Sequence, residues 1–244
     1  MSAVQSQVSR TETIATILRD EILSGQYRTG ERLPSERDLC ERFSISRGAV
    51  REALKQLQQL GIASIQPSGA RVAPIEDCTL DVLGPLLDLN ELPDAKLVDE
   101  VLHMTGVLMR EAAATAIEKA TDEELEAAEA IIDEIIACSG DHARQFEAVR
   151  KLAEFYVTVA DHLVLRLIVN GLRTSFMTRM GKLVPINGLE PDEMAQPAKR
   201  IRKALIERNP DELGAGMHDL NRLFRNSARR VLKKASRDPL TELK

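Results

Sequence analysis

Apolar residues recur at helical spacing along most of the chain. From Arg10 to Ser24 they fall three or four positions apart, so they share one helical face before Gly25 ends the segment. The same period returns at Lys96 and continues to Leu232. Polar, Gly and Pro positions divide that second stretch into helices expected at 96–119, 121–138, about 142–181 with a break near Asp161, 191–208 and 210–234. The pattern therefore predicts a mainly α-helical protein.

The stretch between the two helical regions has a different pattern. Ser35 precedes a short helix, and Asp38 at its third position nearly completes a capping box. Ser46 is the expected cap of the next helix, in which an apolar stripe runs until Gly61 ends it. Two β-prone runs follow in "IASIQPSGARVAP", residues 62–74, and predict a hairpin. Helices followed by a β hairpin are the elements of a winged helix-turn-helix domain.

A chain of 244 residues is long enough for two domains. Residues 74–94 contain Pro and Gly together with an apolar run, which favours a packed linker with one short helix. The predicted organisation is a winged helix-turn-helix domain at 1–76, a linker at 77–94, an all-helical bundle domain at 95–235 and a tail at 236–244.

Composition excludes several classes of protein. No apolar run approaches the roughly 20 residues that span a bilayer, and the polar start lacks the core of a signal peptide, so we expect a cytoplasmic protein without membrane contact. Three widely spaced cysteines predict neither a disulfide framework nor a zinc site. We find no nucleophile elbow, phosphate loop or paired catalytic histidine and carboxylate, so we expect no enzyme and no cofactor.

Charge is divided between regions of the chain, although the net charge is -5. Residues 42–71 carry five Lys and Arg against one Glu, a local charge of +4. Residues 118–134 carry eight Asp and Glu against one Lys. Such segregation is expected when one domain meets a polyanion and the other does not.

Arginines stand at the start of the third predicted helix. With the apolar stripe buried, Arg47 and Arg51 lie one turn apart on the opposite side, where the first residues of a recognition helix meet base edges. Gly48 and Ala49 have small side chains or none, so the helix backbone can approach DNA closely at this point. Exposed helices often carry arginines without any such role, but the cap before and the hairpin after favour DNA recognition.

The stretch "LPSERDLCERFSISRGAVREALKQLQQLGIASIQPSGARV" resembles the DNA-binding signature of the GntR family. The helical remainder, with "ATDEEL" early and "RIRKALIERNPDELGAGMHDLNRLF" late, is similar to the FCD effector domain of the FadR subfamily. This resemblance implies a homodimeric transcription factor, such as a repressor, that binds a pseudo-palindromic operator in double-stranded DNA. It also implies that a small-molecule effector in the helical domain changes the DNA affinity.

The resemblance also implies which positions contact DNA. They are Arg37, Ser46, Arg47, Gly48, Ala49, Arg51 and, at the wing tip, Gly69. An arginine can bind guanine O6 and N7 in a bidentate manner, and a helix N-terminus with its serine suits a phosphate. For Arg37 the alternative is a surface ion pair with Asp38 or Glu41.

Many FCD domains bind a metal through one Asp and three His, and that set is eroded here. The first pair falls on Arg150 and Glu154 or on Leu152 and Tyr156, the third ligand falls near Ala198, and only His218 matches the last. Because one imidazole cannot hold a metal ion, we predict no metal site. Asp99 and His103, one turn apart, are interpreted as a helix-surface pair, and His142 and His162 as cap and surface residues.

An FCD domain without its metal set resembles the branch that senses fatty acyl-CoA. The residues predicted to contact an effector are Arg173, Phe176, His218 and Phe224. Three alternatives stay open: these residues are ordinary bundle core, the protein is a metal-dependent organic-acid sensor, or it is a DNA-binding dimer with no functional effector pocket.

Overall fold

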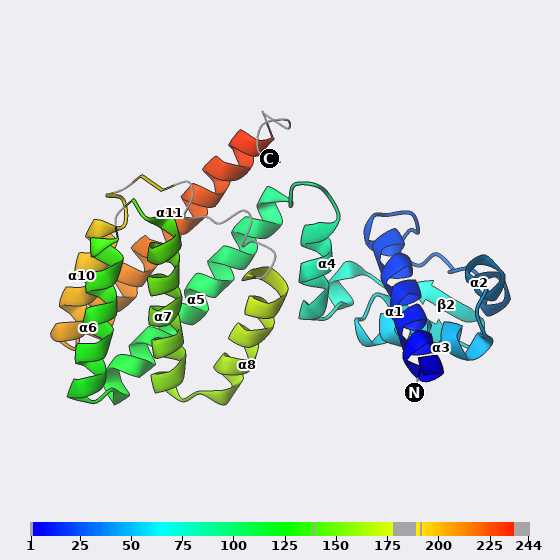
Figure 1. Ribbon diagram of the computed structural model, residues 1–244, viewed down its shortest axis with the longest axis horizontal. Helices are drawn as coiled ribbons and strands as arrows, with labels where there is room; N and C mark the ends of the chain where they lie inside the picture. Colours follow the sequence, from blue (N-terminus) through cyan, green and yellow to red (C-terminus); the bar gives the residue numbers. More distant parts are fainter. Residues whose placement is uncertain (1, 139, 178–188, 191, 237–244) are drawn as a thin grey trace. The chain divides into compact units, whose positions relative to one another are not determined.

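The chain forms two compact units, residues 1–91 and residues 92–244 (Figure 1). Each unit has its own hydrophobic core. The computed structural model describes residues 2–138, 140–177, 189–190 and 192–236. The expected tail lies outside this part of the chain except for Ser236, as do the last four residues of the helix predicted at 142–181.

The N-terminal unit is a winged helix-turn-helix domain, as the sequence pattern predicts. Its elements are α1 (Ser2–Leu23), α2 (Glu36–Phe43), α3 (Arg47–Gln59), β1 (Ala63–Gln66), β2 (Gly69–Val72), two short 3-10 turns η1 (Ile75–Asp77) and η2 (Leu80–Val82), and α4 (Leu83–Asp88). The first helix begins at Ser2, earlier than the Arg10 at which the apolar period begins. Extending a formed helix is far less costly than starting one, so the backbone can continue helical beyond the apolar stripe.

One apolar core joins the three helices of this domain. Leu18 of α1, Leu39 of α2, and Val50 and Leu57 of α3 are fully buried. A capping box comes just before Leu39, because the Ser35 side chain accepts from the Asp38 N–H and the Asp38 carboxylate accepts from the Ser35 N–H. The cap therefore fixes where α2 starts and which of its residues face the core.

The wing is an antiparallel hairpin in which Ala63 pairs with Val72 and Gln66 with Gly69. Arg32 adds an isolated bridge to Arg71, so the segment before α2 runs beside the second strand. Gly69 has φ of +116°, a conformation that L side chains rarely adopt, and it closes the tight turn.

The segment after the wing packs on the same domain. Val82 and Leu87 are each 4% exposed, and Val82 belongs to the N-terminal core. The short helix expected in the linker is α4, in which Gly84, Pro85 and Leu87 are buried.

The C-terminal unit is a helical bundle (Figure 1). Its elements are α5 (Ala95–Lys119), α6 (Asp122–Ala137), α7 (His142–Ala160), α8 (Leu163–Leu172), a π-helical turn η3 (Arg173–Met177), α10 (Ala195–Ile206) and α11 (Pro210–Ala235). The long helices α5 and α11 pack along each other, α7 packs against α5 and α6, and α10 packs against α6 and α11. No helix in the described ranges is long and apolar enough to cross a membrane.

The break predicted near Asp161 lies between α7 and α8. Asp161 adopts a left-handed conformation with φ of 46°, which ends α7. His162 then caps α8, since its Nδ1 accepts from the Leu165 N–H at 3.3 Å. His162 is thus both a cap and an exposed residue, whereas the cap of α7 is Asp141 and His142 is the first residue of that helix.

Candidate functional site

The start of α3 is an exposed helix end that carries arginine. Ser46 caps the helix by accepting from the Ala49 N–H at 3.3 Å, and Ser46, Arg47 and Gly48 are all exposed. Arg47 has no ion-pair partner among the described residues. A helix N-terminus has backbone N–H groups free to bind a phosphate, and an unpaired guanidinium beside it is free to reach a base edge.

Arg51 is exposed one turn later but already binds an acid. Its Nε donates to both carboxylate oxygens of Glu36 on α2, at 2.9 and 3.0 Å, and this hydrogen bond raises the pKa of Arg51. Arg37 is looser, since its nearest acids, Asp38 and Glu41, stand at 3.8 and 3.9 Å and its side chain is 75% exposed. The surface ion pairs expected as the alternative for Arg37 therefore exist, but they leave its donors largely free.

Ala49 and Gly48 of α3 differ in which way they face. Ala49, which the resemblance places among the DNA contacts, is buried, at 7% exposed. The reason is helical phase, because Ala49 and Val50 both face the core. Gly48 faces outward, and a Cβ built on it would meet only Ser46 Oγ, at 3.9 Å. Nothing inside the domain therefore requires a glycine there.

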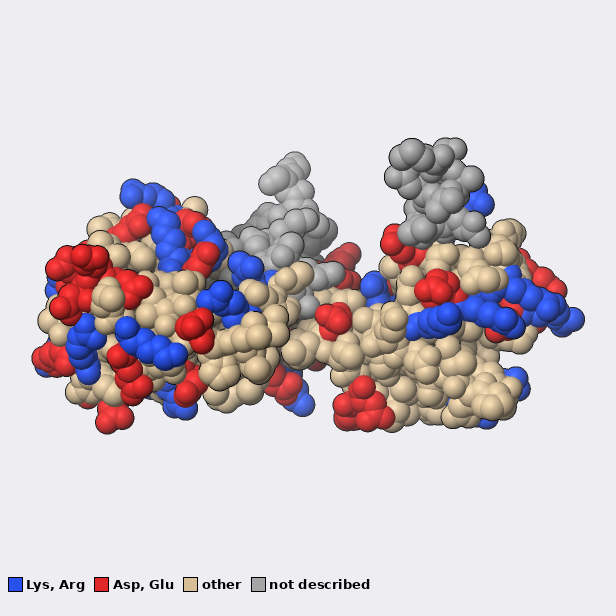
Figure 2. All heavy atoms as spheres, turned by 90° about the horizontal axis from the view of Figure 1, so that it is seen from below, with Lys and Arg blue, Asp and Glu red and all other residues tan. Residues whose placement is uncertain are grey.

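At the wing, Gly69 lies against an arginine that the sequence does not point to. A Cβ at Gly69 would lie 2.9 Å from Arg32 Nε, so the glycine makes room for that guanidinium. Arg71 Nη1 donates to the Gly30 carbonyl at 2.9 Å. Lys and Arg side chains form a band across one face of this unit (Figure 2).

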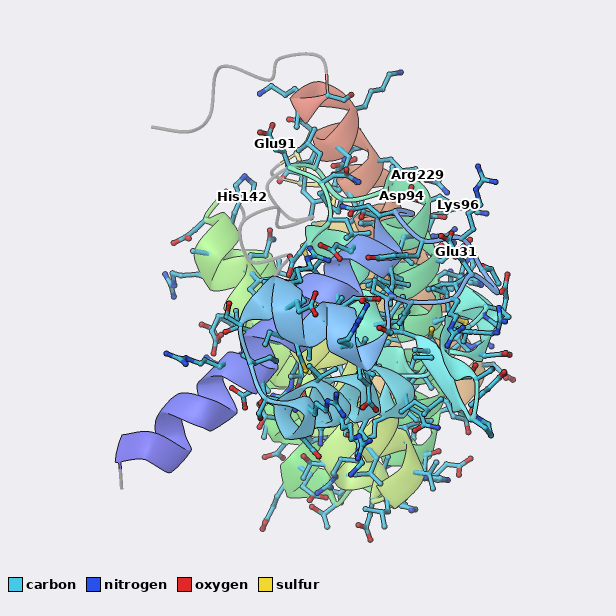
Figure 3. The ribbon with its side chains drawn as sticks, turned by 90° about the vertical axis from the view of Figure 1, so that its right-hand side faces the viewer. Glu31, Glu91, Asp94, Lys96, His142 and Arg229 are labelled. Carbon is cyan, nitrogen blue, oxygen red and sulfur yellow. The ribbon has the colours of Figure 1, made fainter. Side chains whose placement is uncertain are left out.

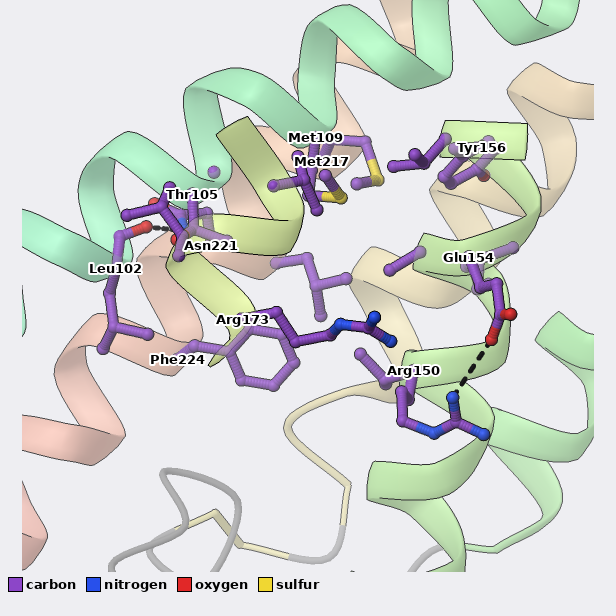
Figure 4. A pocket seen from close by; sticks show the side chains of 18 of the residues that line it. Leu102, Thr105, Met109, Arg150, Glu154, Tyr156, Arg173, Met217, Asn221 and Phe224 are labelled. Atoms are coloured by element: carbon purple, nitrogen blue, oxygen red, sulfur yellow. Dashed lines mark hydrogen bonds and ion pairs between the residues drawn. The ribbon is translucent and has the colours of Figure 1, made fainter. Parts of the chain in front are cut away.

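The C-terminal unit contains a cavity of about 360 Å³ bounded by α5, α7, α8 and α11. Its walls are mainly apolar, and Met109 and Met217 lie side by side at one end (Figure 4). Thr105, Asn170 and Asn221 add amide and hydroxyl groups. Asn221 donates to the Leu102 carbonyl at 2.8 Å and occupies the space that a side chain at position 106 would fill, because Gly106 leaves it open.

Arginines reach this cavity from two sides. Arg150 is held by two acids of its own helix, Glu147 at 2.6 Å and Glu154 at 3.0 Å. The guanidinium of Arg173 extends from the end of α8 toward Arg150 and Glu154 across the cavity (Figure 4). Its hydrogen bond to Asn170 Oδ1 is long, at 3.5 Å, so Arg173 is available to an anion.

Three of the four residues predicted to contact an effector, Arg173, Phe176 and Phe224, line the cavity together. His218 does not, and this prediction is corrected. It is exposed on α11, whereas Met217 and Leu220 face the cavity. One residue of helix turns the side chain by about 100°, so a neighbour of Met217 points away from the same wall.

Both units match known families. Residues 10–72 match the bacterial regulatory proteins of the gntR family, and residues 100–222, half of the chain, match the FCD domain. The chain belongs to the GntR family and carries an FCD domain.

Relatives of this GntR-family protein are named as regulators rather than enzymes. An uncharacterized HTH-type transcriptional regulator of Mycobacterium tuberculosis is 33% identical over 135 residues, 55% of each chain. The galactonate operon transcriptional repressor of Escherichia coli is 30% identical over 145 residues, 58% of this chain and 62% of that protein. The chain thus spans little more than half the length of these relatives.

Solved structures show the same fold. A GntR family transcriptional regulator from Pseudomonas syringae pv. tomato superposes with a TM-score of 0.50 at 18% identity, over 95% of this chain and 89% of that one.

The positions implied for a metal hold no ligand set in this GntR-family protein. Leu152, Tyr156 and Ala198 are each 3% exposed or less and belong to the bundle core, and His218 is exposed. Among the residues that the structure describes, no three His, Cys, Asp or Glu side chains come together. Burial raises the pKa of the Tyr156 hydroxyl, which has no hydrogen-bond partner within the described chain.

Asp99 and His103 are interpreted from the sequence as a helix-surface pair. In the structure these two residues are not a pair on their own. Arg225 of α11 lies between them and donates to Asp99 at 2.6 and 2.9 Å, with Nη1 at 3.2 Å from His103 Nδ1. Arg229 adds a third contact to Asp99 at 2.9 Å and lies beside the start of α5 (Figure 3). These hydrogen bonds lower the pKa of Asp99 to about 2. No sequence signal links positions 126 residues apart.

Proposed function

We propose that this GntR-family protein is a ligand-responsive transcriptional repressor of the FadR subfamily. In this proposal a cytoplasmic homodimer binds a pseudo-palindromic operator, and a small metabolite in the FCD cavity changes its DNA affinity. The residues proposed to contact DNA are Arg37, Ser46, Arg47, Gly48, Arg51 and Gly69, with Ala49 contributing backbone only.

One observation carries the DNA half of the proposal. Arg47 is exposed at a capped helix start and has no ion-pair partner in the described part of the chain. A recognition helix uses its first residues for base contacts, and a bidentate arginine to guanine contributes about 1–3 kcal/mol of base discrimination.

The binding test uses a duplex that the wild-type protein selects from a random library. Arg47→Ala is compared with wild type on this duplex by fluorescence anisotropy at fixed salt. We expect a loss of about 1–3 kcal/mol in binding and an unchanged melting temperature. Arg222→Ala, an equal charge change on α11 at a side chain 67% exposed, is the control and leaves binding unchanged. Wild-type affinity in Arg47→Ala would contradict the assignment.

The cavity supports an effector that combines an apolar chain with an anionic group, such as an organic acid or a fatty acyl-CoA. About 360 Å³ is within the range of small-molecule sites. Phe176 and Phe224 supply apolar walls, and Arg173 supplies a guanidinium without an ion-pair partner among the described residues. The metal-dependent alternative has no ligand set in the described residues to support it.

A thermal-shift series tests the effector proposal. Medium-chain and long-chain acyl-CoAs, fatty acids, short organic acids and divalent metals are compared, because a ligand at 100 times its Kd adds about 2.7 kcal/mol of stability. We expect a shift with an acyl-chain anion that Arg173→Gln reduces and Arg222→Gln does not. Silence across the whole series would favour a DNA-binding dimer with no functional effector pocket.

A further inference from the structure

The cavity of the C-terminal unit has an exposed rim and a buried end. Among the residues that line it, Arg150, Glu154 and Arg173 are exposed, so the cavity opens to solvent on their side. Met109 and Tyr156 are 8 and 1% exposed and lie toward the other end, away from the two guanidinium groups (Figure 4). A ligand whose anionic group binds at the rim therefore extends its remaining atoms toward the buried end.

Tyr156 supplies a hydrogen-bonding group at this buried end. Every other buried residue that lines the cavity is a Leu, Val, Met or Phe. None of these side chains donates a hydrogen bond. The Tyr156 ring packs edge-on against Phe155, with the ring centroids 5.6 Å apart and an angle of 66° between the ring planes. The hydroxyl is therefore held on a packed ring within an otherwise apolar wall.

The Tyr156 hydroxyl has no hydrogen-bond partner within the described chain. A buried donor without a partner has lost its bonds to water and gained nothing in return, so such groups are few in native proteins. Burial also raises the pKa of this hydroxyl, which keeps it protonated and able to donate. An acceptor that enters the cavity would satisfy it.

We propose that the Tyr156 hydroxyl donates a hydrogen bond to an oxygen atom at the inner end of the effector. The inference rests on the proposed function, in which the cavity holds an anion with an apolar chain, and it adds a second polar contact to that ligand. The effector is then an acid that carries a neutral oxygen, a carbonyl or a hydroxyl, near the far end of its chain.

A plain acyl chain fits the buried end less well. Its terminal methyl group would lie against the Tyr156 hydroxyl and leave that donor unsatisfied, whereas a carbonyl oxygen accepts from it. A second carboxylate is also disfavoured there. No Lys, Arg or His is among the buried residues that line the cavity, so the charge would be buried without a counter-ion.

The binding test compares matched pairs of ligands on the full chain by isothermal titration calorimetry. Each fatty acid from six to twelve carbons is paired with the oxo acid of the same length whose ketone adjoins the terminal methyl group. A ketone accepts hydrogen bonds and cannot donate them, so any gain requires a donor in the protein. At the length that fits, we expect wild type to bind the oxo acid about tenfold more tightly than the fatty acid.

Tyr156→Phe removes only the hydroxyl, and we expect it to lose this preference while it binds the fatty acid as wild type does. Because the lost hydroxyl is unsatisfied, the melting temperature should be no lower than that of wild type. Tyr27→Phe removes the hydroxyl of the other tyrosine in the sequence, which lies in the N-terminal unit. This control should keep the preference for the oxo acid.

A spectroscopic signal tests the same contact in the unaltered protein. The chain has two tyrosines and no Trp, so near-ultraviolet difference absorption reports on the tyrosine hydroxyls. A phenol that donates a hydrogen bond absorbs further to the red. We expect this red shift when the oxo acid binds to wild type or to Tyr27→Phe, and no shift when the fatty acid binds.

The results separate this inference from the proposed function. If fatty acids bind wild type as tightly as their oxo partners do, the Tyr156 contact is overturned and the cavity remains an effector site. A preference for the oxo acid that persists in Tyr156→Phe also overturns the contact. If wild type binds neither series, this inference fails together with the acyl-chain effector. Should Tyr156→Phe fail to fold, the wild-type preference and the red shift in Tyr27→Phe decide the question.

Discussion

Two pairs of arginines one turn apart have opposite surroundings. Arg47 and Arg51 open α3 on the outside of the N-terminal unit, whereas Arg225 and Arg229 near the end of α11 converge on Asp99. The side chain of Arg51 is 65% exposed and that of Arg225 is 26% exposed. Two arginines one turn apart therefore do not by themselves identify a DNA-binding surface. The position of an acid far away in the sequence decides whether an arginine is free to bind a ligand.

The largest effect on stability is expected from removing the carboxylate of Asp99. Asp99→Asn leaves two guanidinium groups facing each other at the α5–α11 contact, and we expect a loss of about 2–3 kcal/mol in unfolding free energy. Asp219→Asn is the matched control, since Asp219 also binds two arginines but on the surface of α10 and α11. The expected loss in unfolding free energy for Asp219→Asn is well under half of that for Asp99→Asn. Urea denaturation measures both. Equal losses would show that the Asp99 cluster is no more than a surface network.

The pH dependence sharpens the same contrast. The folded-state pKa of Asp99 is about 2, below its ordinary 3.8, so its contribution is complete above pH 3.8 and is lost as the pH falls toward 2. The difference corresponds to roughly 2 kcal/mol. We expect wild type to lose this stability between about pH 4 and pH 2 and Asp99→Asn to lose less over the same window. Parallel pH profiles for the two proteins would contradict this.

Substituting Gly48, one of the residues proposed to contact DNA, should separate the effect on stability from the effect on binding. Gly48→Ala has room for its methyl group inside the domain, so we expect a gain of about 0.5 kcal/mol in stability. The same methyl group would stand between α3 and DNA, so operator affinity should fall. Gly214→Ala on α11, where a Cβ makes ordinary contact at 3.5 Å, should stabilise without changing DNA binding. A Gly48→Ala protein with unchanged affinity would place DNA elsewhere.

The smallest effect is expected on operator affinity when Glu36, the acid that Arg51 already binds, is changed. Glu36→Gln removes a carboxylate that competes with DNA for Arg51, so we expect operator affinity to rise about threefold at low salt. Anisotropy with the selected duplex measures it, with Glu12→Gln, an exposed acid on α1, as the control. A drop in affinity would mean instead that Glu36 orients Arg51 for its contact.

Local patterns were enough to predict the N-terminal unit. The caps Ser35 and Ser46, the apolar stripe of α3 and the turn before Gly69 all act within a few residues, so the sequence shows them directly. Ala49, which the resemblance places among the DNA contacts, is buried because it is one residue from the outward face. His218 was wrong for a related reason, since matching it to a family position ignored the helical phase set by Met217 and Leu220.

Contacts between distant helices could not be predicted. Arg225 meets Asp99 only because α11 folds back along α5, and the periodicity of either helix contains no register between them. The cavity has the same origin, because its walls come from helices whose packing the sequence does not specify. The long helices themselves followed from the 3.6-residue period, and their ends agreed within a few residues at α5, α6 and α11.

In the function that we propose, sequence-specific binding depends most on Arg47 reading a base. The most direct measurement is a base-resolved binding profile, in which every position of the selected duplex is substituted in turn and bound by wild type and by Arg47→Ala. We predict that Arg47→Ala loses its preference at one guanine in each half-site and keeps the preferences elsewhere. A profile that keeps its shape, with affinity lowered equally at every position, would show that Arg47 contacts only phosphate and would contradict its role as the base-reading residue.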